Sequence, residues 1–350
     1  MSSSAASLAR SDTTADASTT ATAGTAAEPR LESGPIRTER PEAKPASKVE
    51  RLANVERLRV LAMLEIVRYH DHDDRLLWVG GLGLPTFLLL TNLFNTTLTE
   101  KRGLSKFLAD KRERLFLPWV FWSLLYGGVL AVTALRHSQP LSEVLSWNMI
   151  LAGTNSHLWF VPFALFSAGL VAGAQYLTRS LPDRPVAYSA AGVGLVVLLV
   201  IGLMPQYPFE APIPQWLLSL PSSFFGFALG RFVLAWDGKV QVRDMVPIAI
   251  VCAIGAVAFG VFAPNMLIWR YSVSILIVFV AFLRPGTIDP ISKFMSPLLF
   301  GIYLAHPFIG HRMLVKIPGL EHSQLFFIAD FVITAIAVHL LKKTPLRRFV

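Results

Sequence analysis

The sequence predicts an all-α, polytopic membrane protein with about ten transmembrane helices and both termini in the cytoplasm. Hydrophobic residues make up 53% of the 350 positions and charged residues only 16%, which is far more apolar than a soluble chain. Long apolar runs recur along the chain, and a bilayer accepts such runs as helices because a helix satisfies its own backbone hydrogen bonds. Lysine and arginine gather in alternate segments between these runs, as the positive-inside rule describes.

The first 48 residues differ in composition from the rest. Residues 1–48 are rich in Ala, Ser, Thr and Pro and contain no Phe, Trp or Tyr. Such a segment cannot bury a core, and it lacks the apolar stretch of a signal peptide. We therefore predict a disordered cytoplasmic tail at 1–48 and a membrane domain at 49–350.

Ten apolar segments in the membrane domain are long enough to be candidate spans. The first is short and polar, because it carries Glu65 and Arg68. The segment 141–152 is too short to cross and is expected at the surface or dipping into the bilayer. The ten predicted spans cover residues 55–71, 76–98, 115–136, 157–178, 186–204, 214–236, 244–263, 267–284, 294–315 and 323–342.

The loop charges predict which side each end of a span faces. Most lysines and arginines fall in the loops that share a side with the two termini, including 101–114 and 342–348. These loops are therefore expected in the cytoplasm. On this topology Arg59 lies near the cytoplasmic end of the first span, and His70 lies toward the outer end.

The charge and the cysteine content exclude other classes. The formal net charge is +9, but the basic residues lie between apolar runs and form no patch interleaved with aromatics, so no nucleic-acid partner is expected. The single cysteine, Cys252, excludes internal disulfides and thiolate-cluster metal sites. Its apolar surroundings favour a small buried hydrophobe.

The first span carries the leading catalytic candidate. Arg59 and His70 are eleven residues apart, which places them on one helical face about 16 Å apart along the axis. A histidine can take and return a proton near neutral pH, and Asp71 is close enough to orient His70. Two other interpretations are a histidine that only caps the helix and a metal site in the run 70–74. That contiguous run lacks the i, i+4 spacing of helical ligands, so no metal site is predicted.

Glu65 is a second ionisable residue within the first span, and charge inside a membrane is a candidate for function. It lies on a different face from Arg59 and His70. Arg68 is three residues further on, so we interpret Glu65 as one partner of a packing ion pair.

Basic residues precede the third span. Lys111 and Arg114 stand one turn apart, and with Arg59 they predict a cluster of cations at the cytoplasmic surface. Such a cluster fits either ordinary positive-inside anchoring or a binding site for phosphate groups.

Two further polar groups occur, one just before the fourth span and one within the ninth. Asn155, His157 and Trp159 precede the fourth span and are expected at the outer surface. Tyr303 and His306 lie three residues apart in the ninth span, where a buried histidine can also be a hydrogen-bonded packing residue. The sequence contains no glycine-rich nucleotide loop, no GxSxG and no Cys/His zinc pattern.

These motifs together resemble the acyltransferase 3 family of membrane O-acyltransferases, without an appended SGNH domain. Arg59 and His70 match its R-x10-H. The segment 80–94, GGLGLPTFLLLTNLF, loosely matches a run of glycines, phenylalanines and Ser-Gly. Lys111 and Arg114 match R-x2-R before the third span, HLWFVP matches the start of the fourth, and GIYLAH matches a late motif that ends at His306. Thr91-Asn92 replaces Ser-Gly, and Lys111 replaces an arginine.

The resemblance implies a bacterial inner-membrane enzyme. Its expected reaction moves an acyl group from cytoplasmic acyl-CoA, as co-substrate, to a hydroxyl of an envelope glycan, glycolipid or related carbohydrate or lipid acceptor. No permanently bound cofactor is expected. The implied catalytic residues are His70 and Asp71, the donor-binding residues are Arg59, Lys111 and Arg114, and the candidate substrate-site residues are Thr91, Asn92, Trp159, Tyr303 and His306. The alternatives are a transporter or exporter of a glycan or lipid, and a non-catalytic relative.

Overall fold

The computed structural model describes residues 53–71, 81–144, 146–204, 209–235, 242–263, 265–283, 289–320, 323 and 325–350. Every regular element in these ranges is a helix, which confirms the all-α prediction. The predicted tail at 1–48 lies outside the described residues, as do His72, Asp73 and Asp74 of the acidic run.

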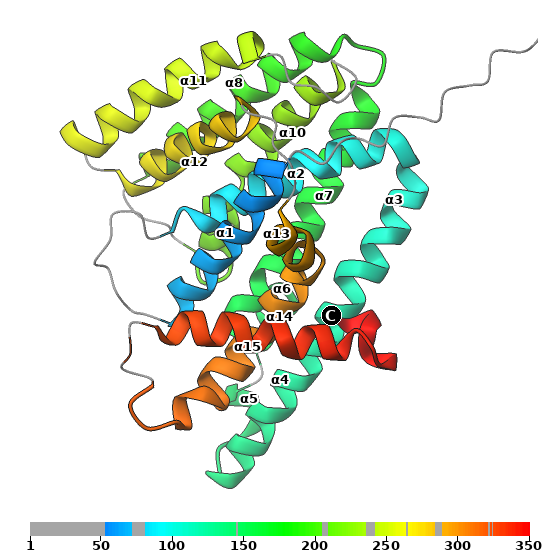
Figure 1. Cartoon of the computed structure of the whole chain (residues 1–350), viewed down its shortest axis with the longest axis vertical. Coiled ribbons are helices and arrows are strands. Elements are labelled where there is room, and N and C mark those ends of the chain that lie inside the picture. Colours follow the sequence, from blue (N-terminus) through cyan, green and yellow to red (C-terminus); the bar gives the residue numbers. More distant parts are fainter. Residues whose placement is uncertain are drawn as a thin grey trace, which may run out of the picture. The chain divides into compact units, whose positions relative to one another are not determined.

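Fifteen α-helices and six short 3₁₀ or π segments form the described chain (Figure 1). The α-helices are α1 Ala53–Asp71, α2 Gly83–Arg102, α3 Leu104–Lys111, α4 Leu117–Arg136, α5 Leu141–Val144, α6 Met149–Ala152, α7 Phe160–Leu177, α8 Asp183–Gly202, α9 Ile213–Ser219, α10 Pro221–Leu234, α11 Val242–Val257, α12 Met266–Leu283, α13 Pro290–Met295, α14 Leu299–Arg312 and α15 Phe326–Leu341. The short segments are η1 Arg112–Phe116, η2 Ser156–Trp159, η3 Ala258–Phe262, η4 Ser296–Leu298, η5 Leu314–Lys316 and η6 Pro345–Phe349.

Each of the ten predicted spans contains a helix, and six helical segments are long and apolar enough to cross a membrane. Two further apolar helices, Met266–Phe282 and Phe326–Leu341, are shorter, and α1 and α2 carry more polar residues. The count of ten spans and the cytoplasmic termini therefore stay predictions. The six segments are Leu104–Arg136, Ser156–Leu177, Asp183–Gly202, Ile213–Leu234, Arg243–Phe262 and Pro290–Lys316.

Two local predictions can be compared directly with helix bounds. The second span was predicted from residue 76, but its helix begins at Gly83, and residues 72–80 lie outside the described part. The segment 141–152 forms only the four-residue helices α5 and α6, so the prediction that it does not cross is confirmed.

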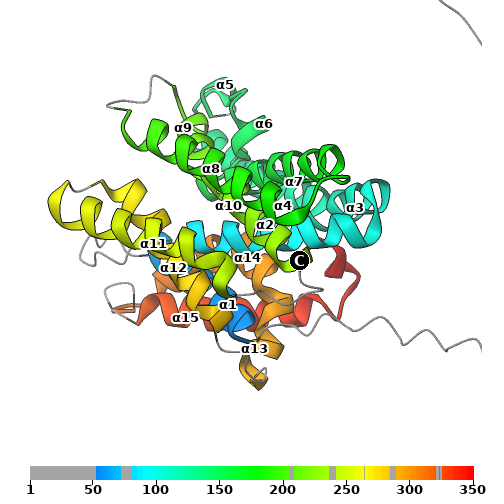
Figure 2. The ribbon, with the colours of Figure 1, turned by 90° about the horizontal axis from the view of Figure 1, so that it is seen from above.

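The buried apolar side chains form two main clusters. One joins α1, α4, α7, α14 and α15, and the other joins α2, α8, α10 and α12. Helix α2 packs against both α1 and α10, and Figure 2 shows α2 between α10 on one side and α1 on the other. Helix α1 packs against several other helices, and Ala62, Met63, Ile66 and Val67 in its middle belong to the first cluster.

Helices α2 and α10 approach closely because α10 presents two glycines. A Cβ on Gly226 would lie 2.5 Å from the Cβ of Asn92, and one on Gly230 would lie 2.4 Å from the Cβ of Thr96. Two glycines four residues apart are a common device for tight helix contact in membranes. Glycines of α10 therefore make room for the side chains of Asn92 and Thr96 on α2.

The end of the chain returns to α4. The indole nitrogen of Trp122 donates to the carbonyl of Phe349 at 2.9 Å, and the Phe349 ring stacks on Phe121 at 4.5 Å between centroids. Figure 1 shows the C-terminus next to α4 after α15 has crossed α14. This return places the basic C-terminal segment near the cations of η1.

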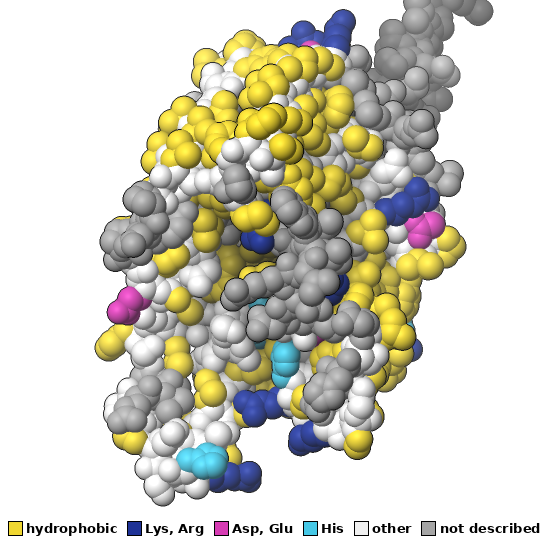
Figure 3. Space-filling model, turned by 90° about the vertical axis from the view of Figure 1, so that its left-hand side faces the viewer, with side chains coloured by type: hydrophobic (Ala, Val, Ile, Leu, Met, Phe, Trp, Pro, Cys, Tyr) yellow, Lys and Arg dark blue, Asp and Glu magenta, His cyan; other side chains and the backbone are white. Residues whose placement is uncertain are grey.

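Hydrophobic side chains cover the upper part of the face shown in Figure 3, where α11 and α12 lie. Helix α11 and the following π segment expose large side chains, including Ile254, Val261 and Phe262. A face of this kind avoids water and fits contact with lipid.

Candidate active site

Three histidines from distant parts of the chain converge at the end of α1. The His70 ring lies 5.4 Å from that of His306 and 6.3 Å from that of His157, measured between centroids. His157 and His306 lie 5.5 Å apart, and both are almost completely buried, with 1% and 0% exposure. The structure thus brings together two predicted site residues, His70 and His306.

Local backbone features position His157. Gly153 adopts φ +74°, and a Cβ there would lie 2.5 Å from the Cβ of Leu158. This left-handed glycine lets the chain turn tightly into η2, so that Leu158 and His157 are both buried. The hydroxyl of Tyr303 on α14 donates to the carbonyl of His157 and fixes η2 against that helix. The turn encloses His157 within the protein, and its predicted place at the outer side of the membrane stays a prediction.

Tyr126 and the α14 backbone form a second wall around the histidines. The Tyr126 hydroxyl donates to the carbonyl of Leu304 at 3.0 Å, and its ring lies 5.3 Å from that of His157. His306 is held from its own helix, because its Nδ1 contacts the carbonyls of Tyr303 at 2.9 Å and Ile302 at 3.2 Å. Its Nε2 is buried and has no hydrogen-bond partner among the described residues.

A carboxyl pair lies beside this cluster. Asp71 has a fully buried side chain, and its carboxyl group lies near enough to that of Asp330 on α15 for the two to interact electrostatically. Both Asp71 oxygens and Asp330 Oδ2 are buried without a hydrogen-bond partner among the described residues. Asp330 also accepts from Thr334 at 2.9 Å, and Gly310 makes room for it, since a Cβ there would lie 2.6 Å from Asp330 Oδ2.

The carboxyl pair is connected to the open part of the site by a further histidine. His311 Nε2 lies 3.6 Å from Asp71 Oδ1. Asp71 therefore lies between Asp330 and His311, and it joins α1 to both α14 and α15. Asp71 thus lies at the end of α1, next in sequence to His70, and its predicted catalytic role stays a prediction.

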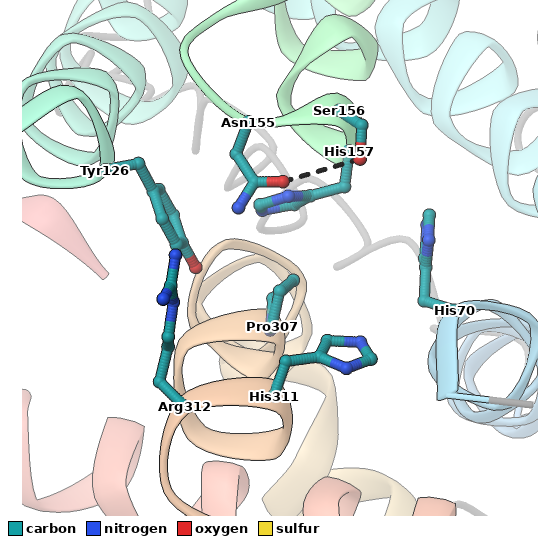
Figure 4. A pocket seen from close by; sticks show the side chains of 8 residues that line it. All are labelled: His70, Tyr126, Asn155, Ser156, His157, Pro307, His311 and Arg312. Atoms are coloured by element: carbon teal, nitrogen blue, oxygen red, sulfur yellow. Dashed lines mark hydrogen bonds between the residues drawn. The ribbon is translucent and has the colours of Figure 1, made fainter. Parts of the chain in front are cut away.

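His70 lines two cavities. The first, of about 330 Å³, is bordered by polar groups, and Figure 4 shows His70 and Tyr126 on opposite sides of it. Arg312 lies beside Tyr126, and His311 lies below, while the turn that carries His157 lies above. The lining residues are His70, Tyr126, Asn155, Ser156, His157, Pro307, His311 and Arg312.

The second cavity, of about 460 Å³, is mostly apolar. Its walls include Trp159 and Tyr303, both predicted substrate-site residues, together with apolar side chains of α1, α2, α9 and α12. Two polar atoms in its wall, Arg270 Nε and Gln215 Oε1, are buried and lack a hydrogen-bond partner within the described chain. A ligand with an apolar body and a few polar groups would satisfy this wall.

The predicted donor-binding cations have different partners. Arg59 donates to Glu56 at 3.0 Å and lies 5.4 Å from the centre of the Phe94 ring. Lys111 lies over Phe107, while Arg114 pairs with Asp110 at 2.8 Å. The contacts therefore group Lys111 and Arg114 around α3 and η1, and they attach Arg59 to α1 and α2.

The C-terminal segment adds a cation to the group at η1. Burial and the nearby positive charge of Arg114 lower the pKa of Lys342, and its ammonium donates to the carbonyl of Pro297. Arg114 itself is largely exposed. A group of cations that already repel one another favours a bound anion.

Thr91 and Asn92 lie in helix packing. The Thr91 hydroxyl donates to the backbone carbonyl of Phe87 at 2.8 Å. The side-chain oxygen of Asn92 accepts from the hydroxyl of Ser167 at 2.8 Å. Ser167 also contacts Ser223 at 2.6 Å, so this polar network joins α2, α7 and α10. Neither Thr91 nor Asn92 is among the described residues that line the two cavities.

Glu65 has a packing role, but its hydrogen bonds are not made with Arg68, the predicted partner. Its carboxylate accepts from the backbone N–H groups of Gly81 at 2.5 Å and Gly83 at 2.7 Å. These amides lie at the start of α2, where unpaired donors and the helix dipole favour an anion. A Cβ on Gly83 would lie 2.2 Å from Glu65 Oε2, so glycine is needed for this approach. Arg68 contributes charge nearby, whereas the hydrogen bonds go to the backbone.

Sequence reasoning missed several residues of the site. Asp330 is an acid inside the apolar run FFIADFVITAI, and the cost of charge in a membrane marks such a residue as a candidate. Tyr126 and His311 carry no comparable local signal, because their roles depend on which helices meet. Among the described residues, no group of three or more His, Cys, Asp or Glu side chains is placed to hold a metal ion.

The fold and the site define a class of protein: a helical membrane protein with a buried histidine cluster beside two cavities. The model of the acyltransferase 3 family, described as an acyltransferase domain, matches residues 52–341. The chain therefore belongs to this family, as its motifs predicted, and it is an integral membrane protein of an acyltransferase family. No curated protein and no solved structure matches it.

Proposed function

We propose that the chain is an O-acyltransferase that moves an acyl group, acetyl or similar, from cytoplasmic acyl-CoA to a hydroxyl of an envelope glycan or lipid. One observation carries the proposal: His70 borders both cavities, so a single base can reach two substrates from opposite sides. Membership of an acyltransferase family supports the same chemistry.

The two cavities differ in the chemistry they favour. The first is lined by Asn155, Ser156 and Arg312, which suit a hydroxyl-rich acceptor. The second is apolar and has unpartnered polar atoms on Gln215 and Arg270, which suit an acyl thioester arm with amide groups. We assign the acceptor to the first cavity and the reacting end of the donor to the second.

The reaction needs one proton to be moved twice. His70 takes the proton of the acceptor hydroxyl while the hydroxyl oxygen bonds to the thioester carbonyl carbon. The carbon–sulfur bond then breaks, and protonated His70 returns the proton to the departing CoA thiolate. His70 takes up and then releases the same proton, so no further acid or base is required.

The donor's phosphates need a separate site. Lys111 and Arg114 lie with Lys342 in a cationic group, and Arg59 lies along α1 about 16 Å from His70 by helical rise. Arginine and lysine both suit phosphate oxygens. We assign these cations to the phosphate end of acyl-CoA on the cytoplasmic side of a bacterial inner membrane.

Mass spectrometry of envelope glycans and lipids from cells with and without the gene tests the function. An ester that disappears with the gene, returns with the wild-type gene and stays absent with His70→Ala is the expected result. Unchanged esters, together with glycan or lipid flux through vesicles that contain the protein and no acyl donor, would instead indicate a transporter.

A further inference from the structure

His306 has a fixed protonation pattern that gives it a defined role beside His70. Its Nδ1 contacts two carbonyl oxygens of its own helix, those of Ile302 and Tyr303. A carbonyl oxygen only accepts, so the proton of neutral His306 is on Nδ1. The lone pair is then on Nε2, which is buried and without a partner among the described residues.

The direction of this lone pair follows from the same contacts. Because Nδ1 faces the α14 backbone, Nε2 lies on the side of the ring away from that helix. The rings of His70 of α1 and His157 of η2 come from other elements and lie next to His306, at 5.4 Å and 5.5 Å between centroids. An unpaired acceptor in a buried site costs free energy until a donor reaches it.

We propose that His306 is a positioning residue whose Nε2 accepts a hydrogen bond from a ring N–H of His70. This rests on the proposed function of His70 as the base. The bond selects one tautomer of His70 and leaves the other ring nitrogen unprotonated and directed at the acceptor hydroxyl. When His70 takes the hydroxyl proton, His306 stabilises the imidazolium, as the acidic member of a hydrolase triad does.

The surroundings favour His70 over His157 as the donor. Both ring nitrogens of His157 are buried without a partner among the described residues, and its backbone carbonyl accepts from Tyr303 of α14. His70 lies at the end of α1 and borders both cavities, whereas His157 is among the described lining residues of the first cavity only. His70 is therefore the neighbour of His306 that substrates in both cavities can reach.

Two substitutions at position 306 separate this role from simple packing. Gln places an amide oxygen where Nε2 lies, so His306→Gln keeps the acceptor for His70. Asn places its amide near Nδ1, so His306→Asn keeps the bond to the α14 carbonyls and loses that acceptor. A residue needed only for packing would respond alike to both changes.

The readout is the rate at which diethyl pyrocarbonate modifies His70, followed by peptide mass spectrometry on the full chain in detergent. This probe acylates an unprotonated imidazole nitrogen and needs no natural acceptor. Exposed His137 serves as the internal reference. His306→Asn is expected to slow modification of His70 by about tenfold or more, and His306→Gln by much less. Equal rates in the two variants, or a wild-type rate in His306→Asn, would overturn the proposal.

Nitrogen NMR of the wild-type protein with labelled histidine provides a second test that needs no variant. His306 is expected as the Nδ1–H tautomer, and a His306 that carries its proton on Nε2 would overturn the inference. Failure of His70→Ala to abolish acyl transfer would refute the proposed function instead, so the two outcomes are distinguishable.

Discussion

The carboxyl groups of Asp71 and Asp330 meet in the interior, although α1 and α15 come from opposite ends of the described chain. This contact joins the end of α1 that carries His70 to α15. Beside it, His311 and the three-histidine cluster complete a polar site inside an otherwise apolar helical core. The arrangement explains how a single titratable ring can be held between two cavities.

Removing the Asp330 partner is expected to loosen this end of α1. Asp330→Ala removes the polar group that faces buried Asp71 and the acceptor of the buried Thr334 hydroxyl, so it should lower the free energy of unfolding by about 1–3 kcal/mol. Asp330→Asn keeps an acceptor for Thr334 and offers an amide donor to Asp71, so it should cost much less. Thermal unfolding in detergent measures both variants. An Asp330→Ala protein as stable as the wild type would contradict a role for this contact in stability.

The cations at η1 are expected to act on donor binding. Lys111→Ala and Arg114→Ala should each raise KM for acetyl-CoA by about tenfold, the factor that ~1.4 kcal/mol gives. Stability should change little, because the Arg114–Asp110 pair is mostly exposed and such pairs contribute about 0–1 kcal/mol. The neighbouring exposed Arg112 provides the control. An equal rise in KM for Arg112→Ala would show general surface charge rather than a site.

The α2–α10 contact predicts a sharp difference between two glycines. A methyl group on Gly226 would meet Asn92 at 2.5 Å and the Leu89 carbonyl at 2.7 Å, whereas one on Gly173 meets nothing within 4 Å. Gly226→Ala should therefore lower the unfolding free energy by about 2 kcal/mol. Gly173→Ala should leave it unchanged or raise it by up to about 1 kcal/mol. Equal melting temperatures for the two variants would refute this account of the packing.

Asp289, which lies outside the predicted spans, is expected to make the stability of the protein depend on pH. The backbone N–H of Ser292, and then the Arg57 guanidinium, hold the pKa of Asp289 well below its usual 3.8. A lowered folded-state pKa gives stability that is present above 3.8 and is lost as the pH falls through the folded-state value. Asp289→Asn keeps the helix cap but removes the charge. The wild type should melt higher than this variant at neutral pH, and the gap should close at low pH. A difference in melting temperature that does not change with pH would contradict a stabilising role for the Asp289 charge.

The sequence predicted the helical class, a helix in each of ten segments, and two histidines that meet. Hydropathy suffices for the helices, because a membrane segment depends on local composition. Glu65 shows the limit. The sequence pattern paired it with Arg68, three residues further on, but the backbone amides of Gly81 and Gly83 at the start of α2 donate to it instead.

His157, which was noted only as a polar residue before the fourth span, and Asp330, which was not noted, show two other limits of prediction from sequence. His157 is buried by a turn that depends on Gly153, and a pattern of hydropathy does not reveal such a turn. Asp330 could have been found, because an acid within an apolar helix is costly unless it is paired. Its partner, Asp71, could not, since the pairing depends on how α1 crosses α15.

The most direct test of the central claim is the transfer of labelled acetyl from acetyl-CoA to acceptor in membranes that contain the protein. His70→Ala is expected to reduce the rate by about 10²–10⁴-fold, the usual contribution of a general base. Exposed His137→Ala, as the matched control, should retain the wild-type rate. A folded His70→Ala protein that transfers acetyl as fast as the wild type would contradict the role of His70 between the two cavities.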